Sequence, residues 1–173
     1  MFDWKDFLKL AQILSDTNQS FRDIEEAAKR TAVSRTYYVV YCSLRDFAER
    51  DLFFQSEERA ADHKRLVRYL QHLAKNMGKN YKKKFFKVAE TLHELRVNRN
   101  MCDYEVDVQN LDVIVSDSLE VVQKVFEVIS GVEEKIDSRI KERIRLLSEK
   151  FEENSKSVDK FERKSNIHPD SLS

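Results

Sequence analysis

An arginine lies on a helix face that the sequence otherwise predicts to be buried. Arg35 is the only charged residue between Thr31 and Leu44, and it continues a line of apolar residues spaced three or four apart. This spacing predicts a helix that is hydrophobic on nearly all sides, from about Phe21 to Leu52, at the centre of a bundle. A guanidinium on such a face needs partners, because removing a charge from water costs free energy.

Two more arginines occupy an inward-facing line later in the chain. A helix predicted from Tyr81 to about Arg99 has an apolar stripe that, continued by steps of four and three, reaches Arg96 and Arg99. Three polar residues follow directly: Asn100, Asp103 and Tyr104. Together with Arg35, this group predicts either a salt-bridge network that satisfies buried arginines or a cleft that binds phosphate or ribose. Both interpretations stay open.

A basic run precedes the second pair of arginines. Between His63 and Ala89 there are nine Lys or Arg residues and no acid, with aromatic residues interleaved. Lys82, Lys83 and Lys84 form its densest part. The run is either a patch that contacts the phosphates of RNA or a solvated helix face balanced by acids elsewhere.

Metal and nucleophile motifs are missing from the sequence. The histidines at His63 and His93 have no second His or Cys at metal spacing, so we expect no metal site and no cofactor. No glycine-rich phosphate loop or nucleophile elbow is present. Cys42 and Cys102 are expected to be reduced thiols in a cytoplasmic protein.

The composition predicts an all-α fold. The chain of 173 residues has only two Gly and one Pro, which leaves little material for hairpin turns or sheet edges. Its formal net charge is zero, and no apolar run approaches the roughly 20 residues needed to span a membrane. Periodicity predicts five helices, over about 3–14, 21–52, 62–75, 81–99 and 107–129.

The character of the chain changes after Gly131. A narrow apolar stripe from Val132 to Phe151, flanked by charges, indicates a surface helix or a two-helix seam rather than a core element. The sequence from Asn154 to Ser173 is polar and is expected to be disordered. We therefore divide the chain into a helical bundle over residues 1–130, an amphipathic assembly helix over 131–153 and a tail over 154–173.

Two segments together resemble the HEPN superfamily of small α-helical domains. Ala32–Tyr38, with the sequence AVSRTYY, is similar to the A-x-S-R-x-Y-Y signature of the central helix in the prokaryotic branch. Leu95–Tyr104, with the sequence LRVNRNMCDY, is similar to the R-x-x-A-D-Y-like end of that branch's next long helix. The helix that opens at His63 also resembles the family, and the match covers roughly residues 10–130 in order and spacing.

The resemblance implies an antiparallel up-and-down bundle of about five helices, followed here by a C-terminal helical extension. HEPN domains commonly dimerise through the faces that carry these polar residues. Many are metal-independent ribonucleases, often toxins or phage-defence effectors paired with a nucleotidyltransferase-like antitoxin. Their catalytic motif is an arginine with a histidine four to six residues further on, and no histidine stands at that spacing after Arg96 or Arg99.

The missing histidine separates the functional hypotheses. Histidine suits metal-free RNA cleavage because its pKa lies near neutrality, whereas Asp103 would be ionised if paired with an arginine. The first hypothesis is therefore a homodimeric, weakly catalytic or non-catalytic domain of a toxin–antitoxin or defence system that binds RNA or nucleotide phosphate. Its candidate ligand-binding residues are Arg35, Ser34, Tyr38, His63, Lys82, Lys83 and Lys84, beside Arg96 and Arg99.

Two alternatives remain at this stage. The chain is either a ribonuclease with a variant active site or a structural adaptor whose stripe from Val132 to Phe151 forms a coiled coil. The candidate catalytic residues of the ribonuclease are Arg96, Arg99, Asn100, Asp103 and Tyr104, with His63 or His93 as possible proton carriers across a dimer interface.

Overall fold

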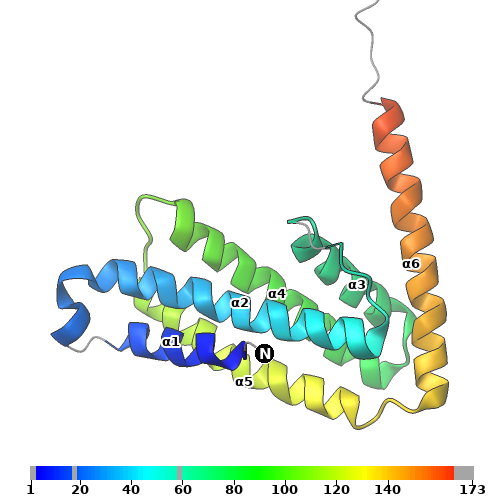
Figure 1. Cartoon of the computed structure of the whole chain (residues 1–173), viewed down its shortest axis with the longest axis horizontal. Coiled ribbons are helices and arrows are strands. Elements are labelled where there is room, and N and C mark those ends of the chain that lie inside the picture. The colour runs from blue at the N-terminus through cyan, green and yellow to red at the C-terminus, as the bar shows by residue number, and fades with distance from the viewer. Residues whose placement is uncertain (1–2, 17–18, 58–59, 166–173) are drawn as a thin grey trace, which may run out of the picture.

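The computed structural model describes residues 3–16, 19–57 and 60–165 (Figure 1). Within these ranges every regular element is a helix, which confirms the all-α prediction. None of these helices is both long enough and apolar enough to cross a lipid bilayer. The elements are α1 (Lys5–Ser15), the 3-10 helix η1 (Gln19–Ile24), α2 (Glu25–Leu52), α3 (Asp62–Asn76), α4 (Lys79–Tyr104), α5 (Leu111–Glu133) and α6 (Ser138–Ser165).

Helix α2 is the centre of the bundle. It packs against α1, α4, α5 and α6, and Figure 1 shows it running through the middle of the molecule with α1 and α4 on either side. Half of its 28 residues are buried, and they are distributed around the helix rather than along one stripe. This agrees with the apolar window seen in the sequence, because a helix covered on several sides must be apolar on several sides.

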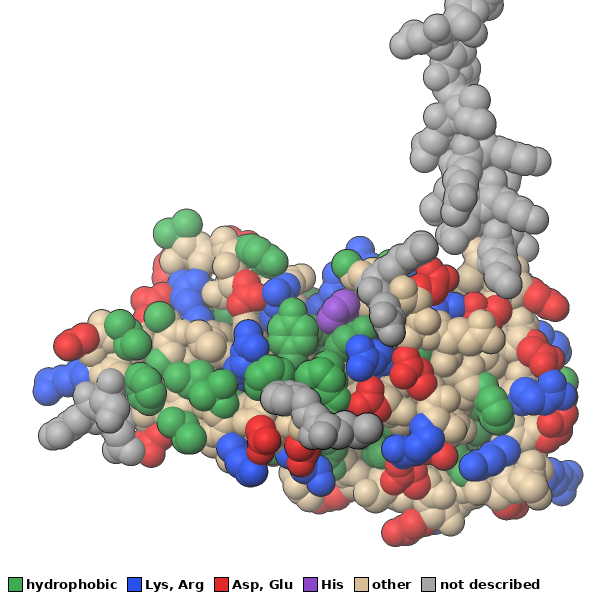
Figure 2. All heavy atoms as spheres, in the orientation of Figure 1, with side chains coloured by type: hydrophobic (Ala, Val, Ile, Leu, Met, Phe, Trp, Pro, Cys, Tyr) green, Lys and Arg blue, Asp and Glu red, His purple; other side chains and the backbone are tan. Residues whose placement is uncertain are grey.

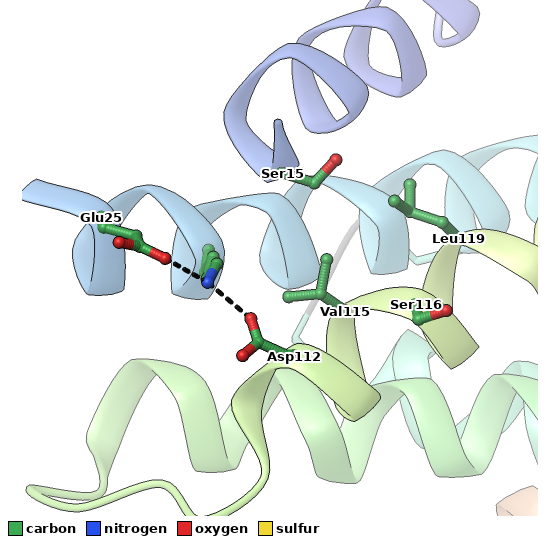
Figure 3. A pocket seen from close by; sticks show the side chains of 7 residues that line it. Ser15, Glu25, Asp112, Val115, Ser116 and Leu119 are labelled. Atoms are coloured by element: carbon green, nitrogen blue, oxygen red, sulfur yellow. Dashed lines mark hydrogen bonds and ion pairs between the residues drawn. The ribbon is translucent and has the colours of Figure 1, made fainter. Parts of the chain in front are cut away.

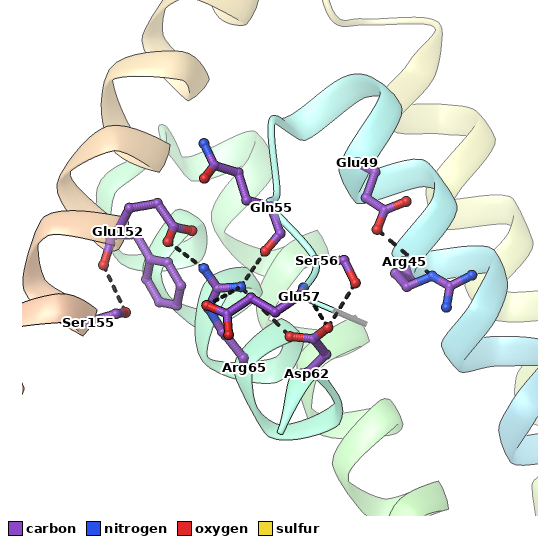
Figure 4. Close-up of polar contacts among 10 residues, drawn as sticks. Arg45, Glu49, Gln55, Ser56, Glu57, Asp62, Arg65, Glu152 and Ser155 are labelled. Carbon is purple, nitrogen blue, oxygen red and sulfur yellow. Dashed lines mark hydrogen bonds and ion pairs between the residues drawn. The ribbon is translucent and has the colours of Figure 1, made fainter. Parts of the chain in front are cut away.

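The link between α2 and α3 is held by buried polar contacts, shown in Figure 4. Asp62, at the start of α3, is 1% exposed and accepts hydrogen bonds from the Ser56 hydroxyl and the Glu57 backbone N–H, both at 2.8 Å. Arg65 lies 3.7 Å from Asp62 and forms an ion pair with Glu152 of α6. These contacts fix the first turn of α3, which carries His63.

The C-terminal helix differs from the sequence prediction. Val132, Ile144 and Phe151 belong to the main hydrophobic core, so the prediction that this stripe is not a core element is wrong. α6 packs against α3 and α2 with its first half, and its far end extends away from the bundle (Figure 1). The helix continues past Asn154 to Ser165, where the sequence predicts a disordered tail; residues 166–173 lie outside the described residues.

The helix predicted over 107–129 begins later and ends later than expected. α5 runs through Gly131 to Glu133, and the Lys84 ammonium donates a hydrogen bond to the Gly131 carbonyl at 2.8 Å. A Cβ at position 131 would lie 3.3 Å from that ammonium. Glycine is therefore accommodated inside the helix because it leaves room for the lysine from α4.

The end of α4 lies further along the chain than the sequence predicts. The helix continues to Tyr104, so Asn100, Asp103 and Tyr104 all lie on its last turns. Arg30 of α2 donates hydrogen bonds to the carbonyls of Cys102 (3.2 Å), Glu105 (2.6 Å) and Val106 (3.0 Å). A cation at this position satisfies carbonyl groups that have no partner within the helix.

Replacing Arg30 by alanine should destabilise the protein, because one side chain caps three carbonyls. We expect the free energy of unfolding to fall by about 1–2 kcal/mol in urea denaturation. Arg139→Ala removes an exposed arginine on α6 and is the control, with no measurable change expected. An equal loss in the two variants would contradict the capping role.

Candidate functional site

The two segments singled out in the sequence face each other in the fold. α2 and α4 run antiparallel, with Ser34 opposite Asp103 and Tyr38 opposite Arg99. Residues separated by more than 60 positions in the chain thus form one polar cluster on the face shared by the two helices. Figure 2 shows hydrophobic side chains gathered in the middle of this face of the molecule, with basic side chains and a histidine beside them.

Asp103 holds one of the arginines in place. Its carboxylate accepts a hydrogen bond from the Ser34 hydroxyl, and its other oxygen lies 2.6 Å from Arg99 Nε, close enough for an ion pair although the N–H does not point at it. Arg99 also donates to Asn100 Oδ1 at 3.1 Å and to the Tyr104 hydroxyl at 3.5 Å. Arg99 is therefore oriented by its neighbours, as a salt-bridge network would require.

Arg35 has a different environment. It is half-buried, and its guanidinium carbon lies 5.0 Å from the ring centre of Phe7 and 5.6 Å from that of Tyr38. Its buried Nε has no hydrogen-bond partner, and no carboxylate among the described residues forms an ion pair with it. Aromatic faces stabilise the cation here, by about 0.5–2 kcal/mol per contact, but they leave its charge uncompensated.

Arg96 is the second arginine whose charge is not compensated. It is half-buried and makes no hydrogen bond, ion pair or ring contact with the residues that the structure describes. Its positive charge adds to the lowering of the pKa of His63 by burial and partly opposes the rise that burial gives to the pKa of Tyr37. A half-buried guanidinium with free N–H groups beside other cations is a ready ligand for an anion.

His63 belongs to the same cluster, although it comes from α3. Its ring stacks on Tyr41 with 3.8 Å between ring centres, and its Nδ1 shares a hydrogen bond with the Tyr37 hydroxyl. Burial lowers the pKa of His63, and the positive charges of Arg96 and Arg99 lower it further. The imidazole is therefore neutral near pH 7 and is available to accept a proton.

Three aromatic residues of this cluster were not among the predicted site residues, although Tyr37 belongs to the AVSRTYY segment. Tyr37 and Tyr41 contact His63, and Phe7 contacts Arg35. Burial raises the pKa of Tyr41 to about 12 and raises that of Tyr37 as well, so both hydroxyls stay protonated. Their i, i+4 spacing on α2 was the available signal, but it predicts burial equally well.

The predicted lysines lie elsewhere. Lys82, Lys83 and Lys84 precede Arg96 by 12 to 14 residues on α4, which places them about 18–21 Å away along the helix axis. Lys84 is bound to the Gly131 carbonyl, and the other two are exposed. These lysines are therefore not members of the cluster around Arg96, and their role as ligand-binding residues stays a prediction.

A separate surface pocket lies between α2 and α5, beside the end of α1 (Figure 3). Its volume is about 460 Å³, and Lys29 lies in it between the carboxylates of Glu25 and Asp112. Two acids face one lysine, so the charged side chains of this pocket sum to −1 and do not favour an anion. In the described part of the chain, no group of three His, Cys, Asp or Glu side chains is arranged to hold a metal ion.

Comparison with known proteins gives two relatives. No protein-family model and no solved structure matches the chain. The uncharacterized protein MJ0992 of Methanocaldococcus jannaschii is 32% identical over 116 residues, which make up 62% of this chain and 63% of that protein. The uncharacterized protein MJ0628 of the same organism is 31% identical over 117 residues, or 62% of this chain and 66% of that protein. The chain thus spans less than two thirds of the length of either relative.

The pKa of His63 tests the electrostatics of the cluster. We expect it to lie below the ordinary value of about 6.5 and to rise in Arg96→Gln, because one of the positive charges that disfavour the imidazolium is removed. The measurement is an NMR titration of the imidazole C2 proton. Arg139→Gln is the matched control, and an identical rise in both variants would exclude a local effect.

The same shift has a consequence for stability. Folded His63 binds a proton more weakly than His63 in the unfolded chain, so the unfolded state takes up more protons as the pH falls. The free energy of unfolding should therefore decrease as the pH falls through about 6.5. In His63→Gln this part of the pH dependence should disappear.

Proposed function

We propose that this chain is a HEPN-like domain protein that binds the phosphate groups of RNA or of a nucleotide on the shared face of α2 and α4. One observation carries the proposal: two half-buried arginines, Arg35 and Arg96, have no carboxylate partner among the described residues. A purely structural network would place an acid beside each of them, because an unpaired buried charge destabilises the fold. An anionic ligand supplies the missing charge.

The three arginines differ in the contacts that orient their guanidinium groups and in the N–H donors left for a phosphate. The guanidinium of Arg35 lies over two rings, which fixes its plane; its Nε is buried, and its terminal N–H groups are left for oxygen atoms. Arg99 is oriented by Asp103 and shares its charge with it. Arg96 lacks both restraints and has all its donors available. Contacts of this kind recognise phosphate by charge and bidentate geometry and carry no base specificity.

The biological setting belongs to the proposal and follows from the family resemblance. In this view the protein is a homodimer and acts in a prokaryotic toxin–antitoxin or phage-defence system, with a nucleotidyltransferase-type antitoxin or a defence complex as partner. The coiled-coil adaptor is less favoured, because Ile144 and Phe151 of its proposed seam are already buried against the bundle.

Binding should depend on Arg96. In a fluorescence-anisotropy titration with a labelled single-stranded RNA, Arg96→Gln should weaken binding by about five- to tenfold and reduce its salt dependence. Lys83→Gln removes the same charge from the same helix at an exposed position outside the cluster and is the matched control. If Lys83→Gln weakens binding more than Arg96→Gln does, the basic run rather than the cluster is the binding surface.

A second candidate function is a metal-independent ribonuclease with a variant active site. The observation in its favour is His63, a neutral imidazole beside the arginines although it lies on another helix. In such a reaction the 2′-oxygen attacks the adjacent phosphorus and gives its proton to His63. The bond from phosphorus to the 5′-oxygen breaks, and the imidazolium returns a proton to that leaving oxygen.

Incubation of RNA with the purified protein in EDTA tests this second function. A ribonuclease should leave 2′,3′-cyclic phosphate ends, and His63→Gln should reduce the rate by about 100-fold or more while RNA binding is retained. Lys83→Gln, at an exposed position on α4 outside the cluster, is the control. Background cleavage that is the same in wild type and His63→Gln would leave only the binding function.

A further inference from the structure

We propose that the ligand of this site is a single-stranded nucleic acid and that Tyr104 provides a stacking face for one of its bases. The inference rests on the proposed function, because it adds a base-binding surface to the phosphate-binding arginines. Its origin is a line of side chains in which rings and guanidinium groups alternate. We call this line the aromatic–arginine row, and it consists of Phe7, Arg35, Tyr38, Arg99 and Tyr104.

The row is continuous across three helices. From the guanidinium carbon of Arg35, the ring centres of Phe7 and Tyr38 are 5.0 and 5.6 Å away. From that of Arg99, the ring centres of Tyr38 and Tyr104 are 5.8 and 5.3 Å away. Each distance lies within the range of a cation–π contact. α1, α2 and α4 thus present one ordered surface of alternating rings and cations.

The two ends of the row differ in exposure. Phe7 is half-buried and packs against the main core, whereas Tyr104 is 71% exposed and belongs to neither hydrophobic cluster. An exposed tyrosine is ordinary by itself. The Arg99 guanidinium, however, lies over the Tyr104 ring and donates a hydrogen bond to its hydroxyl. Tyr104 also ends a helix whose following carbonyl, that of Glu105, is bound by Arg30. Its ring therefore has a defined position and surface open to solvent.

The local charges favour a base rather than a phosphate at Tyr104. Asp103, Glu105 and Asp107 flank it in the sequence, and Asp103 is the acid that pairs with Arg99. Like charges repel, so a phosphate is directed towards Arg35 and Arg96, where no acid is paired. An uncharged base is not repelled by these acids. The site therefore has a cationic part for the backbone and an aromatic end for a base.

This arrangement fits a single strand and not a duplex. In a duplex the faces of the bases are covered by their neighbours, whereas a single strand can turn a base out onto a protein side chain. Proteins that bind single strands combine a cationic track with aromatic platforms, and each stacked base contributes about 1–3 kcal/mol by alanine substitution. The aromatic–arginine row contains both parts within one short stretch of surface.

The first experiment compares variants of Tyr104 in the full chain. With an eight-nucleotide labelled RNA in an anisotropy titration, Tyr104→Leu should raise Kd about tenfold, while Tyr104→Phe should stay close to wild type because it keeps the ring. Phe86→Leu removes another exposed aromatic ring from α4, outside the row, and should leave Kd unchanged. Circular dichroism confirms that each variant is folded. An unchanged Kd in Tyr104→Leu would overturn the inference.

The second experiment separates the inference from the proposed function. Wild type, Tyr104→Leu and Arg96→Gln are titrated with an oligomer of equal length that lacks its bases, and with a duplex of the same sequence. We expect both ligands to bind wild type more weakly than the single strand does. We also expect each of them to bind wild type and Tyr104→Leu equally. If the base-free strand binds wild type as well as the RNA does and still depends on Arg96, base stacking fails and phosphate binding stands. If no ligand shows a dependence on Arg96, the proposed function itself fails.

Discussion

The burial of α2 on several sides constrains the rest of the structure. Because α1, α4 and α5 all pack against this helix, its buried polar residues find partners either within α2, as Thr36 does at the Ala32 carbonyl, or on the helices that cover it. Ser34 and Asp103 meet for this reason, and their hydrogen bond fixes α4 against α2 in one register. With that register set, Tyr38 lies between Arg35 and Arg99. The cluster is a consequence of the packing of the central helix.

The charge balance of the cluster argues against a purely structural role. One carboxylate, Asp103, serves Arg99, and the salt-bridge interpretation accounts fully for that pair. It does not account for Arg35 or Arg96, which have no acid partner among the described residues. Cation–π contacts of about 0.5–2 kcal/mol offset part of the cost for Arg35, and partial exposure offsets part of it for both. Selection for stability alone would favour an apolar side chain at these positions.

Much of the fold could be predicted from the sequence, because helical periodicity reports burial directly. The central helix and the inward position of Arg96 followed from that rule. The contacts of His63 did not follow from it. His63 on α3 stacks on Tyr41 of α2, and helical periodicity does not specify how two helices are placed relative to each other. The separation of Lys84 from Arg96 also follows from the sequence, because twelve residues of helix place them about 18 Å apart.

The role of the C-terminal helix shows a second limit of sequence patterns. A narrow apolar stripe looks the same whether it packs on its own bundle or on another chain, so the position of Phe151 in the core could not be read from spacing. The structure connects this helix to the site through Glu152, which pairs with Arg65 one turn after Asp62. Asp62 in turn anchors the start of α3 and so positions His63, the neighbouring residue. α6 is thus part of the scaffold that positions the imidazole. Glu152 contacts Arg65, Arg65 contacts Asp62, and His63 follows Asp62 in the chain, so a shift of α6 would alter the position of His63.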